Sequence, residues 1–321
     1  MTRISIRAAA CAFLSIAGVC AAFAEDATAS DSAFGVVFTG GIGYTWLKSN
    51  EFVYDADNGN RVSQLIWETN APVATLGANA LVMDHWTIDA NLALGFNGDS
   101  DMADYDWIEP NNPSYAFGDW TDRSLHPDTR LDRYVNFDIA AGRNFDLNDK
   151  VTINLHGGFK YTDYKASAYG GTFIYSNGGF RNDVGSFDNG SQGITYEQRM
   201  PTVFGGIQGT INCDQWTFTG LVRGGATVGA TDTDYHWKTG TRFAGDYDTI
   251  PFLSAGGRAD YHVTEQVSIF VAGNFDKYFH TKANVTLYDI ATGVKKDGPI
   301  NNGSGMDLRS FQLSGGLKVS F

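Results

Sequence analysis

Apolar and polar residues alternate along several stretches of this chain, most clearly at the end of the sequence. From residue 311 to 321, apolar residues or Gly occupy every second position, and polar residues or Gly occupy the others. Segments 86–96 and 151–162 show the same period of two. This period is typical of β-strands. Large apolar side chains on one face, opposite Lys, Asp, Asn and His on the other, indicate a barrel with lipid outside and a polar interior.

Ten alternating segments can be counted, and the connections between them alternate in length. The predicted strands are 34–48, 62–82, 85–97, 133–147, 150–167, 193–212, 215–230, 250–263, 266–283 and 306–321. Tight turns are expected at 83–85, 147–150, 212–215 and 263–266, and long connections at 49–61, 98–132, 168–192, 231–249 and 284–305. Short turns at one end and long loops at the other are typical of outer-membrane barrels. The sequence therefore predicts an all-β fold, a ten-stranded antiparallel transmembrane β-barrel of the outer membrane with five long extracellular loops.

The first 24 residues have the layout of a secretory signal peptide. Arg3 and Arg7 precede a short apolar run that leads to the small-x-small sequence "AFA" at 22–24. We predict cleavage after Ala24, which leaves 25–321 as a single barrel domain. Cys213 is then the only cysteine, so no intrachain disulfide is expected. The remaining chain is strongly acidic, which disfavours nucleic acid and favours basic ligands.

Two nearly identical four-residue motifs contain the candidate catalytic residues. "DYDW" at 104–107 falls in the second long connection, and "DYHW" at 234–237 falls in the fourth. Both connections should rise at the outer rim, from roughly opposite walls of a ten-stranded barrel. Residues two apart in an extended segment point the same way, so Asp104 and Asp106 should project together, as should Asp234 and His236.

These residue types suit the activation of water. An Asp beside a His orients the imidazole, which makes His236 a candidate general base, and two adjacent carboxylates repel so that one holds a proton. Either pair alone is also common in ordinary solvated turns. No Gly-x-Ser-x-Gly or His-Glu-x-x-His motif occurs in the chain. His126 is the alternative base, although its setting in "SLHPDT" also suits a residue that structures a loop.

Longer stretches of the sequence resemble the omptin family of outer-membrane proteases. They are "RVSQLIW" at 61–67, "ADYDW" at 103–107, "WTDRSLHPDT" at 120–129, "YGGTFIYSNGGFRNDVGSFDNG" at 169–190, "ITYEQRMP" at 194–201, "DTDYHW" at 232–237 and "TLYD" at 286–289. The resemblance implies an endopeptidase at the outer mouth of the barrel that forms no covalent intermediate. Asp104 and Asp106 match the family's Asp pair, and Asp234 and His236 match its Asp–His pair.

The same resemblance implies a preference for Arg or Lys at the cut and a dependence on lipopolysaccharide. Asp232 matches one acid of the substrate pocket, and Glu51 matches the other once a one-residue gap is allowed. Residues 97–132 hold nine acidic residues against two Arg, which independently favours basic peptides. The lipid-binding positions are Tyr161, Asp163, Lys165 and Arg199, whereas a further basic residue of that motif is absent near 249–250. No metal or organic cofactor is expected.

Three other functions are compatible with a barrel. An adhesin or invasin would use loop aromatics such as Tyr115, Phe117 and Trp120 to grip host proteins, but it would have no physical reason to keep the catalytic quartet together. A passive pore would conduct ions in planar bilayers. A lipid-modifying barrel enzyme would need a Ser or Cys nucleophile beside its His, and none is predicted there.

Overall fold

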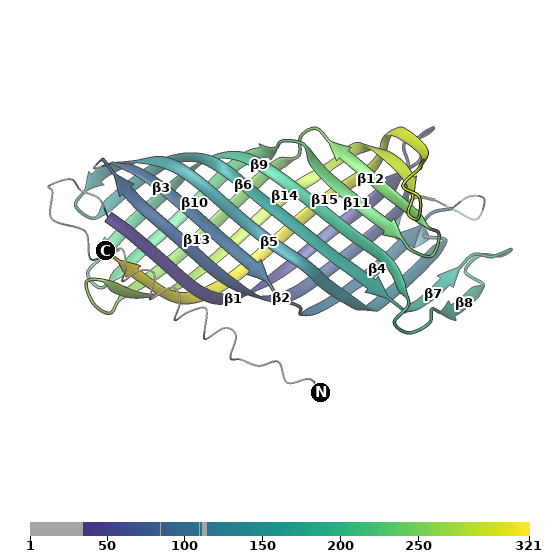
Figure 1. Ribbon diagram of the computed structural model, residues 1–321, viewed down its shortest axis with the longest axis horizontal. Coiled ribbons are helices and arrows are strands. Elements are labelled where there is room, and N and C mark those ends of the chain that lie inside the picture. Colours follow the sequence, from purple (N-terminus) through teal and green to yellow (C-terminus); the bar gives the residue numbers. More distant parts are fainter. Residues whose placement is uncertain (1–34, 84, 109, 111–113) are drawn as a thin grey trace.

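The computed structural model describes residues 35–83, 85–108, 110 and 114–321, and 79% of them lie in β-strands (Figure 1). The proposed signal peptide lies outside the described residues. The strands are β1 Gly35–Tyr54, β2 Arg61–Val82, β3 Trp86–Gly95, β4 Asp99–Asp106, β5 Asp122–Asn148, β6 Val151–Tyr169, β7 Thr172–Tyr175, β8 Asp183–Ser186, β9 Gln192–Cys213, β10 Trp216–Thr227, β11 Ala230–His236, β12 Thr241–Tyr247, β13 Pro251–His262, β14 Val267–Asp289 and β15 Lys295–Ser320. A short 3₁₀ helix spans Phe117–Asp119. No helix in the described part of the chain is long and apolar enough to cross a membrane.

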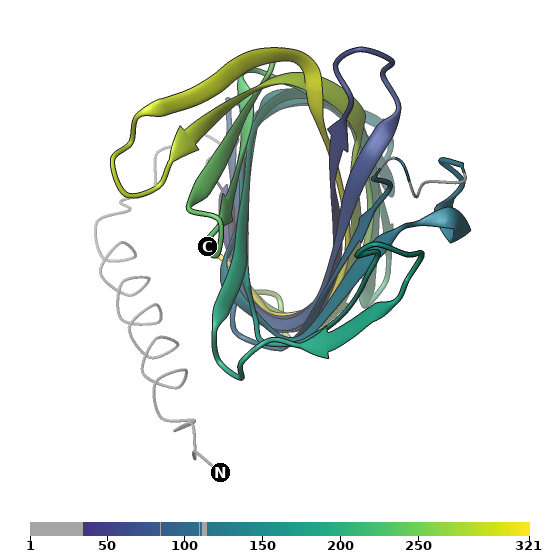
Figure 2. The same ribbon diagram turned by 90° about the vertical axis from the view of Figure 1, so that its right-hand side faces the viewer.

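The strands close into a barrel because the last one pairs with the first. β15 lies antiparallel to β1, with Trp46 opposite Phe311, and β6 joins β5 to β9 on the other side of the ring. β3 with β4, β10 with β11, and β12 with β13 are three wall strands that are each interrupted once, which gives a ring of about ten strands. Viewed from one end, the ring is closed and oval (Figure 2). The predicted ten-stranded antiparallel barrel is confirmed.

The strands are much longer at the outer end than the sequence predicts. Most residues expected in long loops continue the wall, and the connections shrink to 55–60, 107–121, 170–191, 237–240 and 290–294. β7 and β8 form a hairpin within the third connection, and β7 also pairs with the wall strand β5 (Figure 1). Outside the membrane the outward face is polar as well, so the alternation that marks a strand disappears although backbone pairing continues. The placement of the two Asp-rich motifs in loops was therefore wrong, because both lie on strands.

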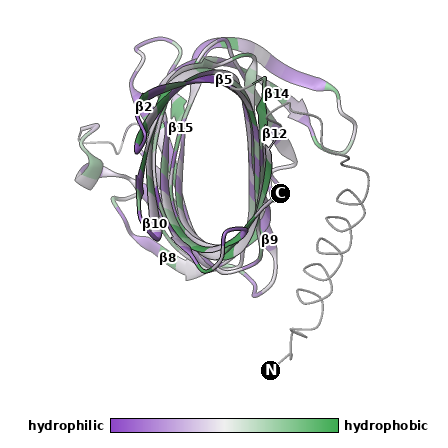
Figure 3. Ribbon diagram, turned by 90° about the vertical axis from the view of Figure 1, so that its left-hand side faces the viewer, coloured by the Kyte–Doolittle hydropathy of each residue, from purple (hydrophilic) through white to green (hydrophobic). Residues whose placement is uncertain are grey.

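An apolar belt surrounds the half of the barrel nearest the tight turns. Many large apolar residues there are exposed, and hydrophobic and hydrophilic residues alternate along the strand ribbons (Figure 3). The belt includes Ile42, Leu76, Ile88, Ile139, Leu155, Val203, Ile207, Phe218, Val222, Ile269, Val271, Leu313 and Leu317. At its outer edge Trp46 stacks on Phe311 with 5.6 Å between ring centroids. An apolar band edged by aromatic rings is what a barrel needs to span a bilayer.

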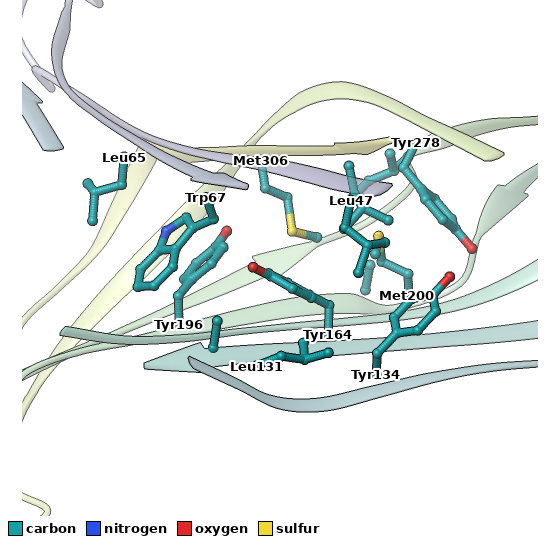
Figure 4. Close-up of a cluster of buried hydrophobic side chains, with 14 of the residues drawn as sticks. Leu47, Leu65, Trp67, Leu131, Tyr134, Tyr164, Tyr196, Met200, Tyr278 and Met306 are labelled. Carbon is teal, nitrogen blue, oxygen red and sulfur yellow. The ribbon is translucent and has the colours of Figure 1, made fainter. Parts of the chain in front are cut away.

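The residues that line the barrel interior differ between its membrane half and its outer half. In the membrane half, polar side chains surround a cavity of about 400 Å³, and the wall carries buried ion pairs such as Lys160–Asp276 at 2.9 Å. Further toward the outer rim, aromatic and aliphatic side chains from opposite walls fill the interior (Figure 4). Trp67 of β2 stacks on Tyr196 of β9, with 5.9 Å between centroids. This layer forms the floor of the outer mouth.

Candidate active site

Asp104 and Asp106 lie at the outer end of β4, between β2 and β5. Asp104 lies opposite Leu65 and Ser124, and Asp106 lies opposite Ser63 and Asp122. Ser63 Oγ donates a hydrogen bond to Asp104 Oδ1 at 3.3 Å. Tyr105 alternates to the other face, where its ring contacts Phe117. The predicted projection of the two carboxylates from one face of an extended segment agrees with this arrangement.

Asp234 and His236 lie on β11, which is held between β9 and β12. Asp234 lies opposite Tyr196 of β9 and Phe243 of β12. Tyr196 also belongs to the aromatic layer that forms the floor of the mouth, so β9 contributes both to the floor and to the wall beside the pair. His236 Nε2 lies 2.5 Å from Asp234 Oδ2. The second oxygen of Asp234, Oδ1, is buried and has no hydrogen-bond partner among the described residues. Asp234 can therefore orient the imidazole through Oδ2, and its side chain also lies within hydrogen-bonding reach of Glu51.

The two pairs face one another across the mouth and influence each other's protonation. β4 and β11 lie at the same end of the barrel (Figure 1), beyond the apolar belt. Burial alone would lower the pKa of His236, but attraction to Asp234, and then to Asp104 and Asp106, raises it to about 9. Burial raises the pKa of Asp104 to about 6, with His236 opposing the rise. Four groups from opposite walls thus form one coupled cluster.

Asp106 is a carboxyl group of this cluster that favours its protonated form. Burial, and then repulsion from Asp104, raise the pKa of Asp106 well above its ordinary value. Two carboxylates cannot both stay ionised at low cost when they are buried side by side. The cluster therefore contains a potential proton donor, Asp106, and a potential proton acceptor, His236, on opposite sides of the mouth.

Glu51 and Asp232 complete an acidic wall next to the Asp–His pair. Burial, followed by repulsion from Asp234 and Asp232, raises the pKa of Glu51 well above its usual value. Its Oε2 is buried and has no hydrogen-bond partner among the described residues. Glu51 reaches this place from β1, since it lies five residues beyond Trp46, about 16 Å further along the strand. Glu51 therefore lies at the cluster, although its match to the second acid of the substrate pocket requires a one-residue gap in the alignment.

Asp232 is held rigidly by hydrogen-bond donors from two strands, β9 and β12. The hydroxyls of Tyr196 and Tyr247 donate to Oδ2 at 3.1 and 2.9 Å, and the Gly245 amide donates to Oδ1 at 3.0 Å. A Cβ at Gly245 would lie 2.2 Å from Oδ1, so only glycine permits this close approach. Burial raises the pKa of Asp232 to about 6 despite the two tyrosine hydrogen bonds. Asp232 therefore presents a fixed, buried carboxylate to the mouth.

His126 is buried in β5 with both ring nitrogens engaged. Nδ1 lies 2.6 Å from the Gly170 carbonyl and Nε2 lies 2.8 Å from Ser124 Oγ, while the ring stacks on Phe187. Since a carbonyl only accepts, Nδ1 carries the hydrogen and Nε2 accepts from Ser124. This arrangement joins the wall to the connection at 170–191, which favours the loop-structuring interpretation of His126 over the catalytic one.

The four residues of the proposed lipid site lie together on the outer wall, and two neighbours join them. Arg133 of β5 binds both oxygens of Asp163, at 2.8 and 3.0 Å, and also contacts Glu197. Glu197 pairs with Arg199 at 2.6 Å and lies 3.7 Å from Lys165. The sequence analysis missed Arg133 and Glu197. Glu197 could have been found from its position two residues before Arg199, whereas Arg133 required the register between β5 and β6.

No group of three or more His, Cys, Asp or Glu in the described residues is arranged to hold a metal ion. The cluster has instead an imidazole, four aspartates and a glutamate around one opening. The closed barrel, its apolar belt and this buried Asp–His cluster at the outer mouth define a class, the outer-membrane β-barrels that carry an enzyme site at their extracellular end.

Comparison with known proteins gives the family. Residues 34–321 match the model of the Omptin family, and the chain belongs to it. Protease 7 of Escherichia coli O157:H7 is 33% identical over 282 residues, which cover 85% of this chain and 86% of that protein. The outer membrane protease OmpP of Escherichia coli K12 is 30% identical over 284 residues, with coverages of 85% and 86%.

A solved structure agrees with this assignment. The crystal structure of the outer membrane protease OmpT from Escherichia coli superposes with a TM-score of 0.82 at 28% identity, covering 92% of this chain and 99% of that one. The predicted family and outer-membrane location are confirmed, and the chain is a surface protease of the outer membrane.

Proposed function

We propose that this protease is an endopeptidase that cleaves next to Arg or Lys by activating a water molecule between its two acidic pairs. The observation that supports this most strongly is the mutual influence of His236 with Asp104 and Asp106 across the mouth. A reacting water between these walls would have an acceptor on one side and a hydrogen-bonding carboxyl pair on the other.

In the proposed reaction each group has one role. Asp104 and Asp106 bind the water, and His236 takes its proton as the oxygen attacks the scissile carbonyl carbon. Asp234 holds the imidazole and stabilises the imidazolium that forms. His236 then passes the proton to the amide nitrogen as the carbon–nitrogen bond breaks. Two products leave, one with a new carboxyl group and one with a new amine, and no covalent enzyme intermediate forms.

The raised pKa of His236 gives the substrate's charge a role in this reaction. With a pKa of about 9, His236 is an imidazolium in the unoccupied site at neutral pH. A base must be neutral to accept a proton. A substrate cation bound beside Glu51 and Asp232 would repel the imidazolium and lower the pKa of His236. A basic side chain would therefore both anchor the peptide and help to produce the active base.

The preference for a basic residue rests on Glu51 and Asp232. Both carboxyl groups are buried beside the Asp–His pair, and Glu51 Oε2 has no hydrogen-bond partner among the described residues. A guanidinium or ammonium group supplies the missing donor and the compensating charge. The test is a fluorogenic peptide with one Arg, compared with the same peptide carrying citrulline, the neutral isostere. Equal cleavage of both peptides would contradict the proposed pocket.

Activity toward the Arg peptide should fall as the pH drops through about 6. Asp104 and Asp232 both have a pKa of about 6 in the unoccupied site, so both are ionised above this pH and become protonated below it. Loss of two required charges should make the fall in kcat/KM steeper than tenfold per pH unit. The measurement is a pH profile of kcat/KM from pH 4 to 8, with the folded state followed in parallel. A flat profile through this range would contradict the assignment of both carboxylates.

We further propose that lipopolysaccharide activates the protein by binding at Tyr161, Asp163, Lys165 and Arg199. Arg133 and Glu197 extend this set, so three cations stand among two acids on the outer wall. An Arg guanidinium binds a phosphate through two parallel hydrogen bonds. A phosphate would compete with Asp163 for the guanidinium of Arg133, beside Lys165, which binds as a point charge.

Replacing Arg133 and Arg199 together by Ala should raise the lipopolysaccharide concentration needed for half-maximal activity about 10- to 150-fold. The estimate takes about 1.5–3 kcal/mol for the loss of hydrogen bonds to a charged group. The measurement is peptide hydrolysis against lipopolysaccharide concentration. Lys150→Ala, an exposed lysine in a tight turn at the other end, serves as the control. An unchanged activation curve for the double variant would remove both arginines from the site.

A further inference from the structure

Three cations stand side by side on the outer wall, on the three adjacent strands β1, β15 and β14. Lys48 of β1 lies directly opposite Arg309 of β15, and Arg309 lies directly opposite Lys277 of β14. Directly opposed side chains have Cβ atoms about 5 Å apart, and like charges at this spacing destabilise a sheet. Such a row therefore calls for a compensating negative charge.

Acidic side chains pair with the two lysines at the ends of this row but not with Arg309 at its centre. Lys48 Nζ lies 2.6 Å from Glu68, and Lys277 Nζ lies 3.5 Å from Asp307. Asp307 also accepts a hydrogen bond from Asn50 at 2.9 Å. The exposed guanidinium of Arg309 forms no hydrogen bond or ion pair with any residue that the structure describes. An unpaired arginine thus stands between two lysines.

A row of aromatic residues next to these cations, on the side of the tight turns, indicates where the cations lie relative to the membrane. Trp46, Phe311 and Phe275 are opposed in the same way on the same three strands, two residues nearer the tight turns. All three rings are exposed, at 41%, 45% and 38%. Aromatic rings at the edge of an apolar belt mark the boundary between acyl chains and headgroups. The cationic row therefore lies at the level of the lipid headgroups in the outer leaflet.

The row has the same composition as the cluster proposed above for lipopolysaccharide. That cluster combines Arg133, Lys165 and Arg199 with two acids, and it is centred on β6. The row combines three cations with Glu68 and Asp307, and it is centred on β15. In the order of wall strands, β6 and β15 lie on opposite sides of the ring. Figure 2 shows β14 and β15, in yellow-green and yellow, across the opening from the teal strands.

We propose that Lys48, Arg309 and Lys277 form a second lipid site, which binds the phosphate of an outer-leaflet lipid headgroup. Arg309 would hold two phosphate oxygens through its planar fork while the lysines flank it as point charges. The acyl chains would lie over Trp46, Phe311 and Phe275. This proposal does not depend on the proteolytic reaction, because none of its residues faces the mouth.

The test counts lipids bound to the purified barrel in detergent by native mass spectrometry, using bisphosphorylated lipid A as the probe. The wild type should bind two molecules. Changing Lys48, Lys277 and Arg309 together to Gln should leave one, with binding of the second weakened at least tenfold. Changing Arg133 and Arg199 to Gln should remove the other molecule, and the five changes together should remove both.

Matched variants separate a specific site from general attraction to lipid. Lys48→Arg and Lys277→Arg keep the charge and should retain two lipids. Arg143→Gln removes a cation that lies over Trp86 and Phe145, near the tight turns, and should also leave two. Lipid A without its phosphates should not bind at the row. Two lipids on the triple variant, a loss in Arg143→Gln, or equal binding of the dephosphorylated lipid would each overturn the proposal. Heat-modifiable mobility on gels confirms that each variant is folded.

Discussion

Replacing His236 by Ala is expected to lower kcat/KM for an Arg peptide about 10²- to 10⁴-fold, the usual contribution of a general base. In the proposed reaction His236 is the only group that takes the proton from water. Its removal also leaves Asp234, which is buried beside it at 2.5 Å, without a partner. The measurement is initial hydrolysis rates with saturating lipopolysaccharide, together with heat-modifiable mobility to confirm a folded barrel.

Asp106→Asn, a change on the opposite wall of the mouth, should lower kcat/KM for the Arg peptide to a comparable extent. Asn lacks the carboxyl group that binds the water in the proposed reaction, and Asp106 is a carboxyl group whose pKa is raised well above its ordinary value by burial and by Asp104. His280→Ala is the matched control, since His280 bonds to Tyr54 at 3.0 Å and lies outside the cluster. Near-full activity in His236→Ala or Asp106→Asn would show that the proposed roles are wrong.

Asp232→Asn is expected to reduce the preference for the Arg peptide over its citrulline counterpart about 10- to 150-fold, which corresponds to about 1.5–3 kcal/mol for a hydrogen bond to a charged group. Tyr196, Tyr247 and Gly245 would still surround the side chain, so the change removes charge with little change of shape. The expected loss lies in cleavage of the Arg peptide, whereas cleavage of the citrulline peptide should change little.

Two companion variants locate the effect. Glu51→Gln should reduce the same preference, because its unpaired buried oxygen is the second proposed partner of the substrate cation. Asp246→Asn removes an equal charge from the exposed face of β12 and should leave the preference unchanged. If Asp246→Asn and Asp232→Asn had equal effects, general attraction by the acidic rim would explain the specificity, and Asp232 would not belong to a pocket.

The membrane half of the fold could be predicted from sequence because lipid imposes a pattern on it. Outward residues there must be apolar and inward residues can be polar, so the strands that end at Phe321 or begin at Trp86 are recognisable from alternation alone. Beyond Trp46 both faces of the wall meet water or protein, and the pattern disappears. The strands nevertheless continue to Tyr54 and Asp289, since backbone pairing does not require alternation.

Only the part of the site that depends on local strand geometry could be predicted from the sequence. Asp104 with Asp106, and Asp234 with His236, follow from the rule that residues two apart share a face. Their approach across the mouth depends on the ring of strands, and it requires register that no local pattern contains. Glu51 joins the cluster because β1 pairs with β2, which pairs with β4, so that Glu51, Leu65 and Asp104 lie in one row. Such rows are set by pairing between distant segments.

The central claim is that the two pairs form one site that cuts peptides beside basic residues. The most direct measurement incubates the refolded barrel with a mixed peptide library, with and without lipopolysaccharide, and maps every cut by mass spectrometry. His236→Ala provides the control. The account predicts cuts next to Arg or Lys by the wild type with lipid, and none by the variant. Cuts with no relation to basic residues, or no cuts from a folded and lipid-supplied barrel, would contradict it.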